Sequence, residues 1–332
     1  MILSVIKYNE ENSKFKLYVL LAIVLIAFAT FRDGDKVRDY SNYIYLYNLA
    51  QDGALFDVEY SFEVISLFVN FVFGNVVFLF FIYAFIGVSI KLFAIKELTE
   101  FWFMSLMIYI CNFYILHELT QIRAGIAAGL LLLCVKPIYE RKFKLFILFF
   151  TIAIFFHYSA LVILPLWFLG YKINRNILLA AIPLAYIIYI LNVNLIAIIP
   201  IDHIQYKMEL YLQLQKMGGK EWSEINVFNS ILLLKIFVFY ILMFNIEYLK
   251  EKNKYIPLLV NIFCFSLMSF PIFANIPIVG FRINELLGIV EIILIPLLIY
   301  LFKPKIFAKL IVVGIGIIYL YVSVVYNKYI IF

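Results

Sequence analysis

The sequence predicts an all-α protein that crosses a lipid bilayer many times. Of its 332 residues, 66% are hydrophobic and only 14% are charged, whereas a soluble globular domain is roughly 45–50% apolar and about 25% charged. A protein core of this chain length cannot bury such an excess, so lipid must surround most of the chain. The apolar residues also gather into runs of about the length of a membrane-spanning helix.

The apolar runs follow one another along the chain, each bounded by charged residues, Pro or Gly. They cover approximately residues 17–31, 60–73, 76–95, 102–117, 120–137, 143–156, 159–170, 176–192, 227–246, 256–273, 283–302 and 306–325. A span needs about 20 residues of helix, so the two short runs beside His157 are expected to be half-length, or tilted together around it. No linker of soluble composition interrupts the runs, which predicts a single integral membrane domain over residues 1–332.

Clusters of basic residues set the orientation, because cytoplasmic loops of membrane proteins carry an excess of Lys and Arg. The clusters precede the first run and follow the fifth, seventh, ninth and eleventh runs: Lys7, Lys14 and Lys16; Lys136, Arg141, Lys142 and Lys144; Lys172 and Arg175; Lys250, Lys252 and Lys254; Lys303, Lys305 and Lys309. If these clusters are all cytoplasmic, the turns at 117–123, at His157 and at 274–282 lie outside, as does the loop 193–226.

The run at 60–73 does not fit this alternation as a simple crossing. The loop that begins at Arg32 is then outside, whereas Lys91 and Lys96, beside the third run, look cytoplasmic. We therefore expect residues 60–73 to form a re-entrant or interfacial helix on the outer side, which leaves about 11 transmembrane helices. The alternative is a true span with a weaker charge bias elsewhere.

Arginine and histidine gather on the predicted outer side, where the positive-inside bias disfavours cations. Four of the six arginines and all three histidines lie there: Arg32, Arg38, Arg123, Arg282, His117, His157 and His203. The planar guanidinium suits bidentate binding of phosphate, and Arg123 also opens a helix whose dipole favours an anion. We expect a diphosphate held by Arg123, Arg282 and Arg32, although snorkelling to lipid headgroups is the alternative for Arg123.

Three outer residues are candidates for a general base acting on a hydroxyl. Asp35 and Asp39 follow the turn permitted by Gly34, and His157 lies between two apolar runs. His157 is preferred, because it sits between membrane segments rather than on a mobile loop, but a structural histidine is the alternative. The remaining substrate-binding candidates lie in or beside the outer loops 32–60 and 193–226 and at the outer turns: Tyr40, Glu59, Gln121, Tyr158 and His203. Loop 193–226 is amphipathic and is expected to be an interfacial helix, a lid or a plain surface loop.

Several classes of function are disfavoured. The chain has no P-loop, no HExxH, no CxxC and no Gly-rich dinucleotide fingerprint, so we expect no nucleotide-driven work, no cofactor and no metal. The net charge of +6 is explained by the positive-inside rule rather than by a nucleic-acid partner. An enzyme facing outward would then need a substrate that is already activated, such as a lipid-linked diphosphate.

Four short motifs, in this order and spacing, resemble those of the EpsG/Wzy family of polysaccharide polymerases. They are Arg32…Gly34-Asp35…Asp39-Tyr40, then Glu59-Tyr60, then Gln121-Ile122-Arg123-Ala124-Gly125-Ile126-Ala127, and finally Phe156-His157-Tyr158-Ser159-Ala160. The resemblance covers about residues 32–169, with a weaker echo around Arg282. Family members often carry Gln directly after the arginine of the third motif, where this chain has Ala124, so no role is carried over to that position.

The resemblance implies a fold like that of the glycosyltransferase C superfamily and an activity at the bacterial plasma (inner) membrane. Oligosaccharide repeat units carried on undecaprenyl diphosphate, which serve as both donor and acceptor, would be polymerised at the outer leaflet, with the active site facing the periplasm or exterior. A chain-length regulator is a partner to look for.

Alternatives from other classes remain open. A flippase or other transporter of lipid-linked oligosaccharide would need charges along a path open to both sides and two related halves. Lys235 and Glu291, both inside apolar runs, keep that alternative open, with Lys235 as a candidate partner for Glu291. An O-antigen ligase would share the diphosphate donor, and an acyltransferase acting on sugars would not need several arginines.

Overall fold

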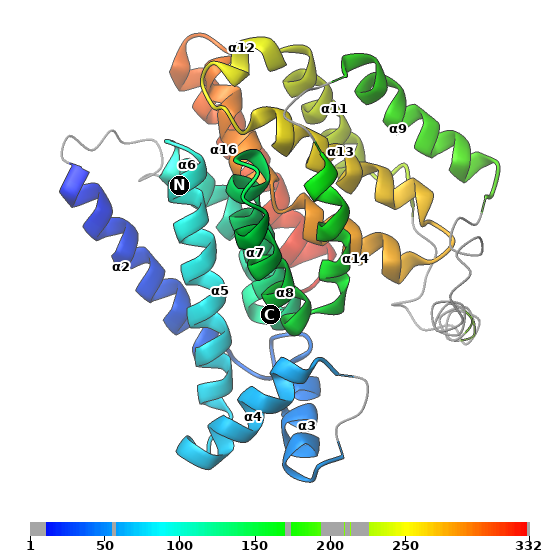
Figure 1. Cartoon of the computed structure of the whole chain (residues 1–332). Helices are drawn as coiled ribbons and strands as arrows, with labels where there is room; N and C mark the ends of the chain where they lie inside the picture. The colour runs from blue at the N-terminus through cyan, green and yellow to red at the C-terminus, as the bar shows by residue number, and fades with distance from the viewer. Residues whose placement is uncertain are drawn as a thin grey trace. The chain divides into compact units, whose positions relative to one another are not determined.

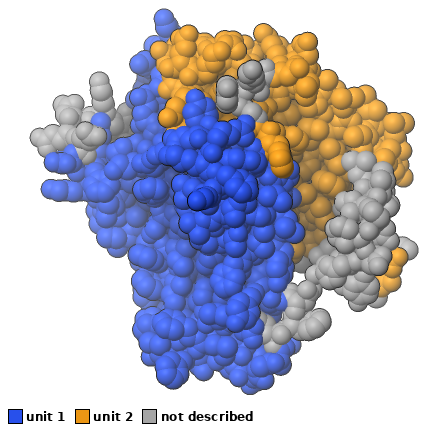
Figure 2. All heavy atoms as spheres, viewed as in Figure 1, with its two compact units in different colours: residues 1–167, 291–332 blue, residues 168–290 orange. Residues whose placement is uncertain are grey.

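The computed structural model describes residues 11–54, 58–169, 174–193 and 226–330, together with Glu209 and Gln213. Within these residues the regular secondary structure is helical (Figure 1), apart from an isolated antiparallel bridge between Val37 and Ile330. It forms two compact units, residues 1–167 with 291–332 and residues 168–290 (Figure 2). The single membrane domain expected from the sequence stays a prediction.

The first unit contains most of the long helices. In chain order they are α2 (Glu11–Thr30), α3 (Tyr40–Gln51), α4 (Tyr60–Phe73), α5 (Val77–Leu98), α6 (Trp102–Ile108), the π-helix η1 (Tyr109–Thr120), α7 (Ile122–Tyr139), α8 (Phe143–Phe156), the 3-10 helix η2 (Tyr158–Phe168), α15 (Glu291–Leu294), the 3-10 helix η5 (Ile295–Tyr300), α16 (Lys305–Tyr321) and the π-helix η6 (Val322–Tyr326). The second unit contains α9 (Arg175–Ile190), α11 (Ser230–Phe244), α12 (Ile246–Lys250), α13 (Ile256–Ile272) and α14 (Pro277–Gly288).

Each apolar run predicted from the sequence corresponds to a helical segment. Among the described residues, six are long and apolar enough to cross a membrane: Asn12–Thr30, Val77–Leu98, Trp102–Thr120, Ile122–Tyr139, Pro277–Tyr300 and Lys305–Tyr326. Six shorter apolar helices accompany them: Tyr60–Phe73, Phe143–Phe156, Tyr158–Phe168, Arg175–Ile190, Ser230–Phe244 and Ile256–Ile272. The multi-pass, all-α character is therefore confirmed, whereas the count of about 11 crossings stays a prediction.

Helices α2 and α5 run antiparallel. The hydroxyl of Tyr18, near the start of α2, donates to the carbonyl of Leu92 near the end of α5 at 3.0 Å. The guanidinium of Arg32, just past the end of α2, lies 4.4 Å from the centre of the Phe80 ring near the start of α5. The segment between these two helices therefore begins and ends at the same end of the unit, which we call the Arg32 end.

Helices α3 and α4 occupy this segment and lie at the Arg32 end, below the body of the unit in Figure 1. Asp39 precedes α3 with a φ of 67°, a left-handed conformation that Asp tolerates better than most residues. Gly74 ends α4 with a φ of 61°, where a side chain would be strained. This course agrees with a re-entrant or interfacial α4, and whether α4 crosses the bilayer stays a prediction.

A buried polar cluster joins α13 to α14 in the second unit. The amide of Asn284 donates to the carbonyl of Ser266 at 2.7 Å, and the hydroxyl of Ser266 donates to the carbonyl of Asn284 at 2.8 Å. The hydroxyl of Ser269 also donates to the carbonyl of Ser266 at 2.6 Å. Hydrogen bonds of this kind hold helices together where no hydrophobic force between them acts, and they fix α14, which carries the exposed Arg282.

Candidate active site

Three ionisable side chains from separate parts of the first unit meet at the Arg32 end. Glu59, which directly precedes α4, is buried with 4% of its surface exposed. Its Oε2 atom accepts a hydrogen bond from Nη1 of Arg123 on α7. Its Oε1 atom pairs with Nδ1 of His157, which joins α8 to η2. One carboxylate therefore holds both the arginine and the histidine that the sequence singles out.

The local backbone fixes each of these residues. Arg123 is the second residue of α7, as the sequence predicts, and follows the turn at Gln121. His157 is extended between two short helices, and its N–H donates to the carbonyl of Ala153 at 2.8 Å while its own carbonyl accepts from Ala160 at 3.0 Å. The two short runs form separate helices of 14 and 11 residues that adjoin at His157, and a common tilt of these helices in the bilayer stays a prediction.

An aromatic cluster lines the arginines at this end. The Arg123 guanidinium lies 5.6 Å from the centre of the Phe62 ring and 5.9 Å from that of Tyr43. Tyr43 contacts both Phe62 and Phe80, with ring centres 5.9 and 6.4 Å apart, and Arg32 lies over Phe80. Arg32 and Arg123 thus flank the same cluster, whose ring faces attract cations.

Glu59 keeps its charge at neutral pH. Burial by itself raises the pKa of this carboxyl, but the hydrogen bond with His157 and the positive charges of Arg123 and His157 outweigh burial and lower the pKa to about 2. Because Glu59 is ionised, the hydrogen atom in the contact with His157 lies on Nδ1. The Nε atom of Arg123 is buried and has no hydrogen-bond partner among the described residues, so this guanidinium retains a donor for a further group.

Arg32 is tied to the backbone. Its Nε donates to the carbonyl of Ala29 at 2.7 Å and its Nη1 to the carbonyl of Leu119 at 2.5 Å. Burial lowers its pKa to about 10, which still leaves it cationic at neutral pH. Its Nη2 atom has no partner within the described part of the chain. Arg32 therefore joins the ends of α2 and η1 and offers one remaining donor.

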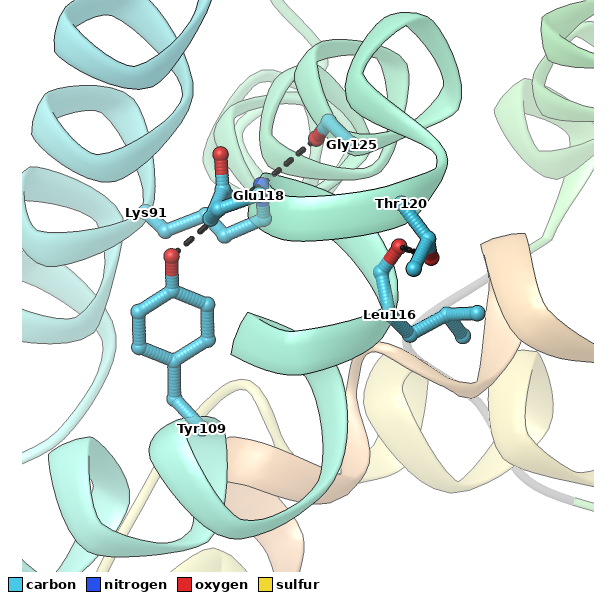
Figure 3. Close-up of polar contacts among 6 residues, drawn as sticks. All are labelled: Lys91, Tyr109, Leu116, Glu118, Thr120 and Gly125. Carbon is cyan, nitrogen blue, oxygen red and sulfur yellow. Dashed lines mark hydrogen bonds and ion pairs between the residues drawn. The ribbon is translucent and has the colours of Figure 1, made fainter. Parts of the chain in front are cut away.

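A second charged network lies deeper in the unit (Figure 3). The ammonium of Lys91 on α5 donates to Oε1 of Glu118 on η1 at 2.5 Å and to the carbonyl of Gly125 on α7 at 2.6 Å, and the Tyr109 hydroxyl donates to the same Glu118 oxygen at 2.9 Å. Lys91 and Glu118 are almost fully buried, at 0% and 1% side-chain exposure. This network ties together α5, η1 and α7, and α7 is the helix that carries Arg123.

Close backbone approach accompanies the network. A Cβ atom at Gly87 would lie 2.3 Å from Oε2 of Glu118, and one at Gly125 would lie 2.7 Å from the carbonyl oxygen of His117. Only glycine fits such contacts. The Gly125 that follows Arg123 in the sequence motif therefore lets the start of α7 pack against the π-helix.

The comparison with known protein families covers nearly the whole chain. The family model described as the EpsG family matches residues 15–331.

The chain belongs to the EpsG family.

EpsG family members are Wzy-like polysaccharide polymerases, so the resemblance inferred from four motifs is confirmed and extends beyond residues 32–169 in both directions. No curated protein and no solved structure matches the chain. Membership makes this a multi-pass membrane protein of a glycosyltransferase-like polymerase family, whose members act on lipid-linked sugars in the bilayer. It favours polymerisation over the flippase, ligase and acyltransferase alternatives.

The structure brings together some of the site residues predicted for this EpsG family protein. Glu59, Arg123 and His157 are in direct contact, and Tyr40 joins their surroundings by stacking on Phe80 with ring centres 5.1 Å apart. Gln121 lies at the N-cap position of α7, and its side chain makes no capping hydrogen bond.

Other predicted residues lie apart from this contact or were not described. Asp35 and Tyr158 are exposed, and Asp39 is half-buried in the turn before α3. Arg282 is exposed on α14 in the second unit. His203 and nearly all of loop 193–226 lie outside the described residues.

The structure changes two interpretations of charged residues that lie inside apolar runs. Lys91 does not mark a cytoplasmic loop, because it is buried in the unit and paired with Glu118. Glu291 accepts a hydrogen bond from the Tyr319 hydroxyl at 2.7 Å, a partner that the sequence did not predict. The Lys91–Glu118 pair was not predicted from the sequence, although a lysine and a glutamate in or beside neighbouring apolar runs indicate an ion pair.

Proposed function

We propose that this protein polymerises oligosaccharide repeat units carried on undecaprenyl diphosphate, by glycosyl transfer at the outer leaflet of the bacterial plasma membrane. One observation carries the proposal: an arginine suited to phosphate and a histidine suited to proton transfer meet on the same buried carboxylate, at one end of a helical unit. The membership of the EpsG family supports the polymerase activity.

In this proposal Arg123 binds the donor diphosphate, together with the remaining donor of Arg32, and Arg282 stays a candidate ligand on the grounds of the sequence alone. A guanidinium that contacts two phosphate oxygens stabilises the negative charge that grows as the diphosphate leaves. The buried, unpartnered Nε of Arg123 supports this role. The second candidate ligand, Arg282, is exposed and carried by the helix that the Ser266–Asn284 hydrogen bonds fix.

His157 is the proposed general base. The acceptor sugar hydroxyl gives its proton to Nε2 of His157 while its oxygen forms a bond to the anomeric carbon of the donor. The bond from that carbon to the diphosphate oxygen breaks, and undecaprenyl diphosphate leaves with the electron pair. A positioned base of this kind contributes about 10²–10⁴-fold to the rate. Asp35 and Asp39 are the remaining candidates for this role.

The direct test is polymerisation by membranes that contain single variants, supplied with lipid-linked repeat units. Arg123→Ala and His157→Ala should each lower the rate of polymer formation at least 100-fold, with the protein still present in the membrane. Arg282→Ala is measured alongside as the test of the second ligand. Arg175→Ala, an exposed arginine on a different helix, is the matched control and should stay active.

The products separate the competing functions. In cells that carry an inactive variant, glycans capped with a single repeat indicate a lost polymerase. Full-length polymer retained on the lipid carrier would indicate a ligase instead, and repeat units accumulating on the cytoplasmic side would indicate a flippase. Polymer of normal length and amount from both Arg123→Ala and His157→Ala would refute the proposed roles.

A further inference from the structure

Glu59 contacts both residues to which the proposed reaction assigns chemistry. Its two carboxylate oxygens are divided between them, Oε2 to Arg123 and Oε1 to His157. The three residues come from distant parts of the chain, with a sequence separation of 64 from Glu59 to Arg123 and of 98 from Glu59 to His157. A carboxylate between a phosphate ligand and a base can influence both.

The contact with His157 determines which ring nitrogen is basic. Because Nδ1 carries the proton that is donated to Glu59, the tautomer places the basic lone pair on Nε2. The carboxylate also stabilises the imidazolium that forms when Nε2 takes up a proton, and it holds the ring in one orientation. The backbone hydrogen bonds of His157 to Ala153 and Ala160 fix the residue that carries this ring.

The contact between Glu59 and Arg123, in contrast, opposes binding of the donor diphosphate. The Arg123 side chain is partly exposed, at 19%, and its Nη1 is occupied by Glu59. An incoming diphosphate carries more negative charge than one carboxylate and approaches the same guanidinium, so the two anions compete. Glu59 is itself buried, which keeps its charge close to the arginine and makes that competition strong.

We propose that Glu59 is a positioning residue with two tasks. It orients His157 for proton transfer, and it pairs with Arg123 until the donor diphosphate displaces its carboxylate from the guanidinium. The proposal rests on the proposed function and deepens it, by turning a residue first considered a substrate ligand into one that acts through Arg123 and His157. When the diphosphate displaces Glu59 from Arg123, Glu59 retains its contact with His157, so the base stays oriented while the donor is bound.

The test separates binding from turnover. Protein in lipid nanodiscs is titrated with inorganic pyrophosphate, and polymerisation is measured on the same preparation. Glu59→Gln, which removes the competing charge, should bind pyrophosphate about 5- to 10-fold more tightly, a gain of about 1–1.4 kcal/mol. Its polymerisation rate should nevertheless fall about 100-fold, because the imidazolium loses its charged partner. A merely structural role for Glu59 would not raise an affinity.

Glu63→Gln is the matched control, because Glu63 lies in the first turn of α4, close to Glu59 in the chain. It should leave both measurements unchanged. Pyrophosphate binding by Glu59→Gln that is unchanged or weaker than in the wild type would overturn the inference. Failure of the proposed function shows differently, since Arg123→Ala would then bind pyrophosphate as tightly as the wild type does.

Glu59→Asp keeps the inference testable if Glu59→Gln does not accumulate in membranes. The shorter carboxylate cannot span both partners. Loss of the His157 contact should lower the polymerisation rate at least tenfold, and loss of the Arg123 contact should tighten pyrophosphate binding. A Glu59→Asp protein with both the wild-type rate and the wild-type affinity for pyrophosphate would overturn the inference.

Discussion

A buried carboxylate is costly unless it has partners, and Glu59 has two. Taking an ion out of water costs several kcal/mol, and removing one member of a buried pair typically destabilises a protein by about 3–5 kcal/mol. Arg123 and His157 therefore stabilise the ionised form of Glu59, and the pKa lowered to about 2 expresses this. Any variant of one residue in this group leaves an uncompensated neighbour, so its stability has to be measured together with its activity.

The lowered pKa predicts how stability depends on pH. Glu59 titrates near 4.5 when unperturbed and near 2 in the folded protein, so its stabilising contribution is complete above about pH 4.5 and is lost as the pH falls toward 2. The melting temperature of the wild type in detergent should exceed that of Glu59→Gln between pH 6 and 8. That margin should shrink below about pH 4.5. A margin that already disappears between pH 6 and 5 would contradict the assignment of a low pKa to Glu59.

At the scale of helices, the Lys91–Glu118 pair holds α5, η1 and α7 together. A π-helix is rare, and it occurs mostly as a single turn near functional sites, whereas η1 continues for 12 residues. The hydrogen bonds that Glu118 accepts from Lys91 and Tyr109 anchor its last turns (Figure 3). Arg123 follows directly, so the position of the candidate diphosphate ligand depends on this anchor.

Removing one charge of this pair should be more damaging than removing both. Lys91→Met leaves Glu118 buried without its cation, and we expect a loss of about 3–5 kcal/mol in the free energy of unfolding. Adding Glu118→Gln should restore at least half of that loss, because no unpaired charge remains. Thermal or denaturant unfolding in detergent measures both effects.

The control for this comparison is Lys96→Met on the same helix. Lys96 is exposed and lies over the rings of Phe15 and Trp102 at 4.2 and 5.2 Å, so its loss should cost about 1 kcal/mol or less. A double variant no more stable than Lys91→Met alone would mean that the pair does not act through its charges.

The sequence predicts the helices better than it predicts their contacts. Apolar runs and their boundaries indicate where helices lie, and this sufficed to place Arg123 at a helix start and His157 between two short helices. Which side chains meet depends on tertiary packing across long separations, so the convergence of Arg123 and His157 on Glu59 was not predictable from spacing. The π-helix was not predictable either, because a shift in hydrogen-bond register does not change the composition of the segment.

At the scale of the whole molecule, the predicted topology around the site depends on the course of the chain at the Arg32 end. Lys91 no longer supports the original parity argument, because it is buried. The antiparallel pairing of α2 and α5 replaces it: two neighbouring crossings that run in opposite directions require the segment between them to begin and end on the same side. This reasoning again predicts that α4 does not cross the bilayer. If the lysines that precede α2 are cytoplasmic, the loop after Arg32 then faces outward.

Single cysteines test this topology directly. The native thiols Cys111, Cys134 and Cys264 are buried, so background labelling should be low. A thiol reagent that does not cross membranes should label Asp52→Cys and Asn75→Cys, which lie at exposed positions on either side of α4, in intact cells to the same extent. Asp35→Cys should label in the same way, whereas Lys142→Cys, on the predicted cytoplasmic side, should label only after the cells are permeabilised.

If Asn75→Cys also required permeabilisation while Asp52→Cys did not, α4 would be a true span. Labelling of Lys142→Cys in intact cells, with Asp35→Cys protected, would reverse the orientation and place the Glu59, Arg123 and His157 contact on the cytoplasmic side.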